Sequence, residues 1–201
     1  MRAFLAVALA TDVRERIAAL QQELKTFVAS TCAGRIRVTW VKPETIHLTL
    51  KFLGEIDADA VEPLRVRVSA AMEDRPAVDI PIGALGAFPR IEAPRALWIG
   101  PPSHWSSLAQ ANQAEELAAR IEQACEEFAG AGGTHPWRPH LTIARVREGE
   151  REIAQALRAS GLLTRSLQIG SLRVGEISLM KSEMRPDGPV HTPLWSVSLI
   201  R

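Results

Sequence analysis

The segment Ile46-His47-Leu48-Thr49-Leu50-Lys51-Phe52-Leu53 decides the fold, because its apolar and polar residues alternate as in a strand with one buried face. Gly54 follows this segment and ends the predicted strand, which covers residues 46–53. Strict alternation gives the strand an apolar face with Ile46, Leu48, Leu50 and Phe52, and a polar face with His47, Thr49 and Lys51.

A second segment, His140-Leu141-Thr142-Ile143, repeats the pattern of histidine, apolar residue, threonine and apolar residue inside a predicted strand at 139–146. Residues two apart on a strand point to the same face, about 6–7 Å from each other. Each motif therefore presents one imidazole and one hydroxyl together. Because the motif occurs twice on predicted strands, we favour a shared site, although two half-buried histidines bonded to local threonines are the structural alternative.

The remaining periodicities predict helices and strands on both sides of each motif. Thr11 or Asp12 offers an N-cap to the first helix, with Glu15 placed for a capping box. The predicted helices cover 12–30, 57–73, 104–129 and 150–159, the third ending at the glycines of 130–133, and the other predicted strands cover 2–10, 35–41, 77–88, 95–100, 166–181 and 193–200.

Helices and antiparallel-type strands in both parts of the chain indicate an α+β fold. No low-complexity linker separates the two motifs. We therefore expect residues 1–201 to form a single domain made of two intertwined, similar lobes that share a central cleft. Each lobe carries one motif.

Composition limits the function classes. The chain has 201 residues, and 46% of them are apolar. Its formal net charge of +1 excludes binding of nucleic acid through a general excess of positive charge. Cys32 and Cys125 lie far apart in no metal-type spacing, which favours reduced thiols. No stretch approaches the roughly 20 apolar residues of a membrane span. We expect a cytoplasmic protein that does not enter membranes and is a monomer.

Two imidazoles and two hydroxyls in one site suit the cleavage of a phosphodiester. Such a reaction needs a base on one side of phosphorus and an acid on the other, and histidine can serve as either near neutral pH. The hydroxyls of Thr49 and Thr142 can donate hydrogen bonds to the non-bridging oxygens, where charge accumulates. Acidic residues do not cluster in a two-metal pattern, and two isolated histidines make zinc a minor alternative. We expect no metal and no other cofactor.

Longer blocks around both motifs resemble the two-histidine phosphoesterases, and within them the RNA 2′,3′-cyclic phosphodiesterases, which are also described as 2′–5′ RNA ligases. The resemblance covers nearly the whole chain. It begins with Met1-Arg-Ala-Phe-Leu-Ala-Val and includes Trp40-Val-Lys-Pro-Glu-Thr-Ile-His-Leu-Thr-Leu-Lys-Phe-Leu-Gly54, Gly86-Ala-Phe-Pro89, Arg95-Ala-Leu-Trp-Ile-Gly100, Trp137-Arg-Pro-His-Leu-Thr-Ile-Ala-Arg145 and Ser182-Glu-Met-Arg-Pro-Asp-Gly188. The two blocks around the histidines are far more specific than the short motif itself.

The resemblance implies roles for individual residues. His47 matches the general acid that protonates the leaving 3′ oxygen, and His140 matches the general base that activates water. Thr49 and Thr142 match the phosphate-holding hydroxyls, and Arg145 matches an arginine that contacts the phosphate. The implied fold is bilobal and pseudo-symmetric, with two antiparallel sheets lining a central cleft and helices outside.

Other residues are candidate substrate contacts. Phe52 matches an aromatic placed near the base or sugar, with a core residue as its alternative. Trp137 could stack on a base or pack beneath the cleft, and Lys51 shares the predicted face of His47 but could equally be solvated. Strict alternation puts Phe52 and Arg145 on the face opposite their histidines, so their family roles require a bulge or a strand end. Arg145 could otherwise form a surface ion pair.

The leading hypothesis is an enzyme that hydrolyses a terminal 2′,3′-cyclic phosphate of RNA, or of a small nucleotide, to a 2′-phosphomonoester without a metal. Its rate should be bell-shaped with pH, because one histidine must be protonated and the other neutral. The same imidazoles could act on other cyclic or 2′–5′-linked nucleotides, or form a 2′–5′ bond. A non-catalytic protein that binds RNA ends is the alternative from another class.

Overall fold

A computed structural model describes residues 1–32, 36–128, 136–186 and 188–200. Its strands form three antiparallel sheets. The first sheet has the order β10 (Gly188–Ser198), β9 (Glu176–Arg185), β1 (Arg2–Ala8) and β3 (His47–Glu55). The second has the order β2 (Arg37–Trp40), β7 (Leu141–Glu148), β6 (Ala93–Gly100) and β5 (Ala84–Arg90), and the third pairs β4 (Val78–Ile82) with β8 (Gly170–Val174).

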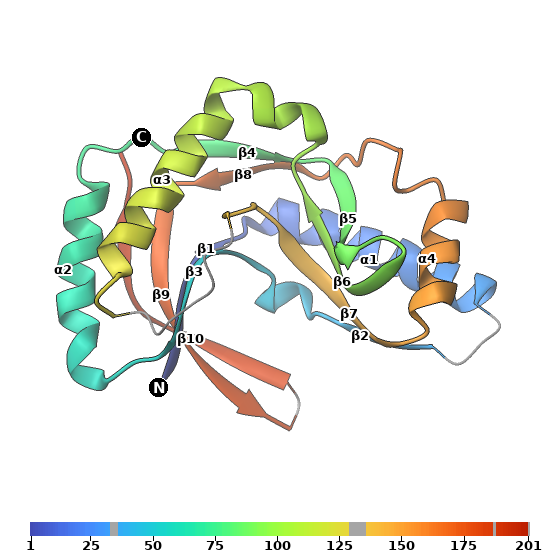
Figure 1. The fold of residues 1–201 in the computed structure, drawn as a ribbon, viewed down its shortest axis with the longest axis horizontal. Coiled ribbons are helices and arrows are strands. Elements are labelled where there is room, and N and C mark those ends of the chain that lie inside the picture. The colour runs from blue at the N-terminus through green and yellow to red at the C-terminus, as the bar shows by residue number, and fades with distance from the viewer. Residues whose placement is uncertain (33–35, 129–135, 187, 201) are drawn as a thin grey trace.

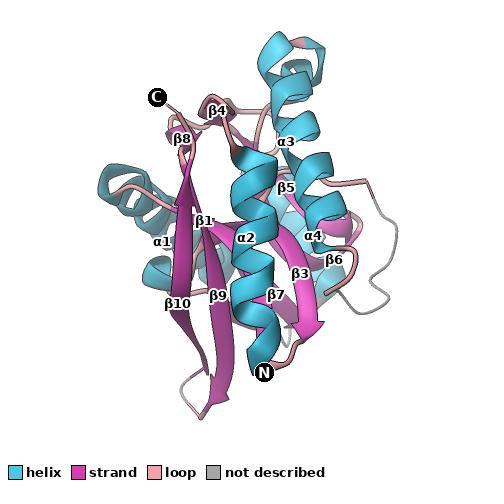
Figure 2. Ribbon diagram, turned by 90° about the vertical axis from the view of Figure 1, so that its left-hand side faces the viewer, coloured by secondary structure: helices cyan, strands magenta, loops and turns pink. Residues whose placement is uncertain are grey.

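Helices cover the outer sides of the two larger sheets (Figure 1). Helices α2 (Val61–Met72) and α3 (Ala109–Cys125) lie against the first sheet, as Figure 2 shows from the side. Helices α1 (Thr11–Thr31) and α4 (Glu150–Ala159) lie beside the second sheet. Three short 3₁₀ helices, η1 (Pro43–Thr45), η2 (Ala58–Ala60) and η3 (Ser103–Ser107), complete the described elements. The α+β class with antiparallel sheets and outer helices is confirmed.

The sheets do not follow the order of the sequence. Strands β1 and β3 from the first part of the chain are joined by β9 and β10 from the last part, and β2 lies beside β7 in the other sheet. One continuous core runs through both sheets and includes Leu5, Ile17, Leu48, Ile121 and Leu141. Among the described residues, no helix is long and apolar enough to cross a membrane.

Several predicted boundaries are wrong for local reasons. Residues 77–88 form two strands in different sheets, because Gly83 binds the carbonyl of Gly100 through its own N–H and turns the chain between them. Residues 166–181 likewise divide into β8 and β9 at Gly175. The predicted helix from 104 starts as η3, where Ser106 and Ser107 bond backbone carbonyls three residues back, and becomes α-helical only at Ala109. Its predicted end at 129 lies outside the described residues.

The predicted cap of the first helix is also wrong. Ala10 occupies the N-cap position, because its carbonyl accepts the first helical N–H, from Arg14, at 3.0 Å, and its methyl side chain offers no capping hydrogen bond. Thr11 and Asp12 therefore lie inside the helix. The predicted helix at 150–159 is confirmed at both ends.

Candidate active site

The two motif histidines are anchored in the same way. His47 is the first residue of β3, and its Nδ1 donates a hydrogen bond to the carbonyl of Thr45 at 2.8 Å. His140 immediately precedes β7, and its Nδ1 donates to the carbonyl of Arg138 at 2.7 Å. Because a carbonyl can only accept, each Nδ1 carries the proton and each Nε2 is left for chemistry.

Prolines prepare both anchoring carbonyls. Pro43 begins the 3₁₀ helix η1, whose last residue, Thr45, turns its carbonyl toward His47. Pro139 keeps Arg138 out of the helical region, so that the carbonyl of Arg138 lies beside the ring two residues later. The sequence thus fixes the orientation of both imidazoles through local backbone geometry.

The motif threonines accompany their histidines as predicted from the spacing. Thr49 and Thr142 are half-buried, on β3 and β7. In the described part of the chain, neither hydroxyl has a hydrogen-bond partner. Both are therefore free to donate to a phosphate oxygen. We call the sheet faces that carry His47 with Thr49 and His140 with Thr142 the motif faces.

A bulge in β3 changes which side chains share the motif face. Leu5 pairs with Lys51 and Ala6 pairs with Thr49, so Leu50 is an extra residue in β3. Beyond it, Lys51 points to the helix layer, is only 12% exposed and forms an ion pair with Glu122 of α3. The prediction that Lys51 shares the face of His47 is wrong for this reason.

The same bulge brings Phe52 to the motif face. Phe52 pairs with Phe4 of β1, their ring centroids are 6.1 Å apart, and the Phe4 ring stacks on His47 at 4.7 Å. Phe52 is 68% exposed and does not belong to the core. The alternation that assigned Phe52 to the apolar face is therefore wrong, and its ring is available to a ligand.

A second bulge reorients Arg145. Leu97 pairs with Ala144 and Trp98 pairs with Thr142, so Ile143 is the extra residue of β7. Arg145 pairs with Ala96, two positions from Trp98, and therefore lies on the motif face with Thr142. Its side chain is exposed, and the described residues offer it no ion pair.

Aromatic residues of the second sheet surround His140. The rings of Phe88 and Trp98 lie 4.9 Å and 6.4 Å from it, centroid to centroid. Trp98 covers Gly86, where an added Cβ would lie 2.2 Å from the indole. A Cβ at Gly100 would lie 2.8 Å from the carbonyl oxygen of Pro139. Both glycines therefore allow the close packing that holds His140.

Trp137 connects the two motif strands. Its Nε1 donates a hydrogen bond to the carbonyl of Thr49 at 3.0 Å, and its half-buried ring packs against the core. This contact holds the segment before His140 against β3. It also leaves the indole nitrogen unavailable to a ligand.

Gln21 of α1 binds the backbone at the bulge of β7, and sequence reasoning missed this residue. Gln21 is 1% exposed and is the only polar side chain assigned to the core of the described residues. Its Nε2 donates to the carbonyls of Val41 and Ile143, both at 2.8 Å. Val41 N–H also donates to the carbonyl of Ile143 at 3.0 Å. Gln21 therefore fixes the extra residue of β7 against the chain that leads to His47.

We expect Gln21→Met to lower the free energy of unfolding by about 2 kcal/mol, because the carbonyl of Val41 loses its donor and that of Ile143 keeps only the Val41 N–H, while the side-chain volume is retained. Urea unfolding measures this loss. Activity should fall further than in Ile17→Ala, a core change on the same helix with a cost of about 2–5 kcal/mol. Equal activity in the two variants would show that Gln21 stabilises the fold without positioning Arg145.

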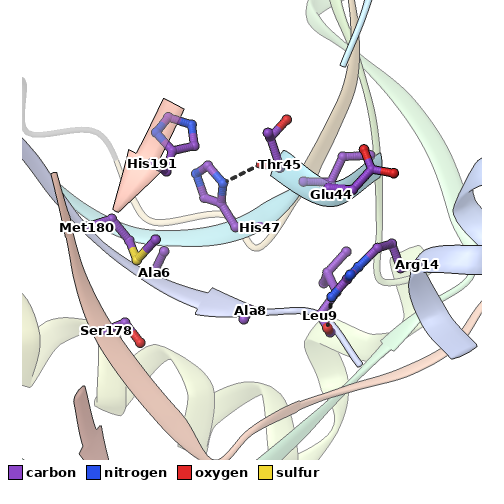
Figure 3. A pocket seen from close by; sticks show the side chains of 11 residues that line it. Ala6, Ala8, Leu9, Arg14, Glu44, Thr45, His47, Ser178, Met180 and His191 are labelled. Carbon is purple, nitrogen blue, oxygen red and sulfur yellow. Dashed lines mark hydrogen bonds between the residues drawn. The ribbon is translucent and has the colours of Figure 1, made fainter. Parts of the chain in front are cut away.

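His191 is the second residue that sequence reasoning missed, because it lies between the predicted strands at 166–181 and 193–200. It lies on β10 with its ring edge-on to His47, 5.3 Å between centroids. A pocket of about 140 Å³ is lined by His47, His191, Ser178 and Met180, and it reaches Arg14 at its far end (Figure 3). His140 does not line this pocket.

Burial lowers the pKa of His47, the carbonyl of Thr45 opposes this shift, and the charges of His191 and His140 lower the pKa further. The strands β3 and β7, at whose starts the two histidines lie, contact each other. Burial also lowers the pKa of His191. Among the described residues, no group of three or more His, Cys, Asp or Glu side chains is arranged to hold a metal ion.

The sequence profile of the 2′-5′ RNA ligase superfamily matches residues 35–185. A protein of Methanothermobacter thermautotrophicus named RNA 2′,3′-cyclic phosphodiesterase is 30% identical, and the alignment covers 96% of each chain. An Archaeoglobus fulgidus protein of the same name is 28% identical, over 96% of this chain and 98% of its own.

Solved structures share the fold. The protein TT0787 of Thermus thermophilus is 25% identical, with a TM-score of 0.71 over 99% of this chain and 98% of that one. E. coli LigT, crystallised with 3′-AMP, is 22% identical, with a TM-score of 0.66 over 100% and 98% of the two chains.

Proposed function

Because the chain belongs to the 2′-5′ RNA ligase superfamily, we propose that it is an RNA 2′,3′-cyclic phosphodiesterase, a hydrolase that acts on cyclic-phosphate ends of RNA or of small nucleotides. One observation carries the proposal. Two imidazoles, each with Nδ1 bonded to the carbonyl two residues before it, leave two Nε2 atoms unoccupied on the motif faces.

The reaction needs one proton taken and one proton given. Nε2 of His140 takes a proton from water as the oxygen of that water attacks phosphorus. Nε2–H of His47 gives its proton to the 3′ oxygen as the bond between phosphorus and that oxygen breaks. The products are a 2′-phosphomonoester and a 3′-hydroxyl. The non-bridging oxygens accept hydrogen bonds from Thr49, Thr142 and Arg145. These donors stabilise the negative charge that develops on the oxygens, so the reaction needs no metal ion for that purpose.

The lowered pKa of His47 has a consequence for its role as the acid. Without substrate, its neutral form is favoured at neutral pH. A bound phosphodiester brings a negative charge beside the ring and raises the pKa again, because an opposite charge favours the protonated form. The acid is therefore formed when substrate binds.

We also propose that the two larger sheets act as one catalytic unit within a single monomeric domain, because each sheet supplies one motif and one core joins them. We place the reaction in the cytoplasm. Both cysteines, Cys32 and Cys125, are free thiols, which suits a reducing compartment.

The test is the product formed from an oligonucleotide with a 2′,3′-cyclic phosphate end, incubated with the protein in EDTA. We expect a 2′-phosphate end, identified by chromatography against 2′- and 3′-phosphate standards. Loss of turnover in EDTA, or a 3′-phosphate product, would contradict the proposed reaction. Tight binding of the end without turnover from pH 5 to 9 would instead identify a protein that only binds RNA ends.

A further inference from the structure

A third histidine completes the pocket beside His47. His191 comes from β10, while Phe4 and His47 come from β1 and β3. The His191 ring is edge-on to Phe4 at 5.0 Å and to His47 at 5.3 Å, with interplanar angles of 84° and 88°. Three strands therefore hold the three rings in one cluster, and the His191 ring lines the pocket with His47 (Figure 3).

The two nitrogens of His191 have different surroundings. Nδ1 is buried, and no hydrogen-bond partner for it occurs among the residues that the structure describes. Nε2 is not enclosed in this way. The nearby charged residues of β9, Lys181 and Glu183, pair with each other at 3.0 Å. Opposite His191 in the ladder lies Ser182, and no bond joins their side chains.

This asymmetry selects one form of the ring. A proton on Nδ1 would be a buried donor without an acceptor among the described residues. The charged ring must carry that proton, whereas the neutral ring can carry its single proton on Nε2, where it can be donated to a ligand. Burial, which lowers the pKa of His191, favours the same neutral form. With the ring neutral and its proton on Nε2, His191 can donate a hydrogen bond into the pocket.

We propose that His191 is a substrate-binding residue that donates a hydrogen bond from Nε2 to an oxygen of the terminal nucleotide. The inference rests on the proposed function, in which His47 protonates the 3′ oxygen. That oxygen is bonded to the ribose, so the nucleoside must lie on the side of phosphorus where His47 stands. The pocket shared by His47 and His191 is on this side, and the small side chains of Ala6 and Ala8 leave room in it.

The test compares His191→Phe, which keeps a ring but has no donor, with His191→Gln, which keeps an N–H donor. One hydrogen bond corresponds to about a tenfold change in binding. We expect His191→Phe to raise KM for a cyclic-phosphate-ended oligonucleotide about tenfold, with kcat within about twofold of the parent. His191→Gln should recover most of the loss. The matched control is His104→Phe, at an exposed position of η3, which should leave both constants unchanged.

Unchanged KM in His191→Phe would overturn the inference, and so would a Gln variant as weak as the Phe variant. Failure of the proposed function has a different signature, because the parent protein itself would then show no turnover. In that case, equilibrium binding of a 2′-phosphate-ended oligonucleotide to the same variants decides. Equal affinity of the parent and His191→Phe would count against His191, and about tenfold weaker binding by His191→Phe would support it.

Discussion

His140→Ala is expected to lower kcat/KM for hydrolysis of a 2′,3′-cyclic phosphate end by about 10³-fold, and His47→Ala by a similar factor. Proton transfer by a positioned group contributes about 10²–10⁴-fold to a rate. Single-turnover rates of the purified variants measure the loss. His104→Ala, an exposed histidine outside the site, should retain the parent rate.

The double variant separates a shared site from two independent ones. If both imidazoles act on one phosphorus atom, removing the second should cost much less than removing the first, because catalytic groups that act as a unit are strongly non-additive. If the loss of kcat/KM in the double variant equals the product of the two single losses, the two histidines act independently. Thermal unfolding checks the fold of each variant, since the His47 ring contacts Phe4 and its loss leaves a gap. A folded His47→Ala or His140→Ala variant with the parent rate would remove that residue from the mechanism.

Arg145→Ala is expected to lower kcat/KM by about 10²-fold, because a donor to the transition-state oxygens is lost and such a donor contributes about 10²–10³-fold. The bulge at Ile143 places the guanidinium on the motif face, and the described residues offer it no competing carboxylate. Arg145→Lys should recover part of the loss, since an ammonium keeps the charge without the two-pronged geometry. Assays quenched at fixed times with the cyclic-phosphate oligonucleotide measure kcat/KM of both variants.

Arg147→Ala is the matched control for Arg145. Arg147 is an exposed arginine of the same strand, two residues farther from His140. The Arg147→Ala substitution removes the same charge from the protein as Arg145→Ala. A general loss of attraction for RNA would therefore affect both variants equally. Equal losses would assign Arg145 to that general attraction. A selective loss at Arg145 would assign it to the phosphate.

The two strands that carry the motifs could be predicted from sequence, but their later residues could not. Period-two alternation located His47 with Thr49 and His140 with Thr142, because apolar residues alternate with them. The bulges then fall at Leu50 and Ile143, which are ordinary strand residues without a glycine to signal irregularity. Resemblance to known proteins indicated roles for Phe52 and Arg145 that alternation alone opposed.

His191 and Gln21 were missed for a different reason. Each acts through contacts with residues far away in the sequence, to His47 in one case and to Ile143 in the other. The register that brings β10 to β9 and β9 to β1 is a tertiary property, and no local pattern contains it. A polar residue among the apolar positions of the first helix was the only available signal for Gln21.

The central position of β1 in its sheet has a consequence for synthesis of the protein. β1 pairs with β3 on one side and with β9 on the other, so this sheet is incomplete until residues 176–185 are made. At about 5–20 residues per second, a nascent chain waits roughly ten seconds or longer between translation of β1 and of β9. During that interval one edge of β1 is unpaired and open to wrong partners.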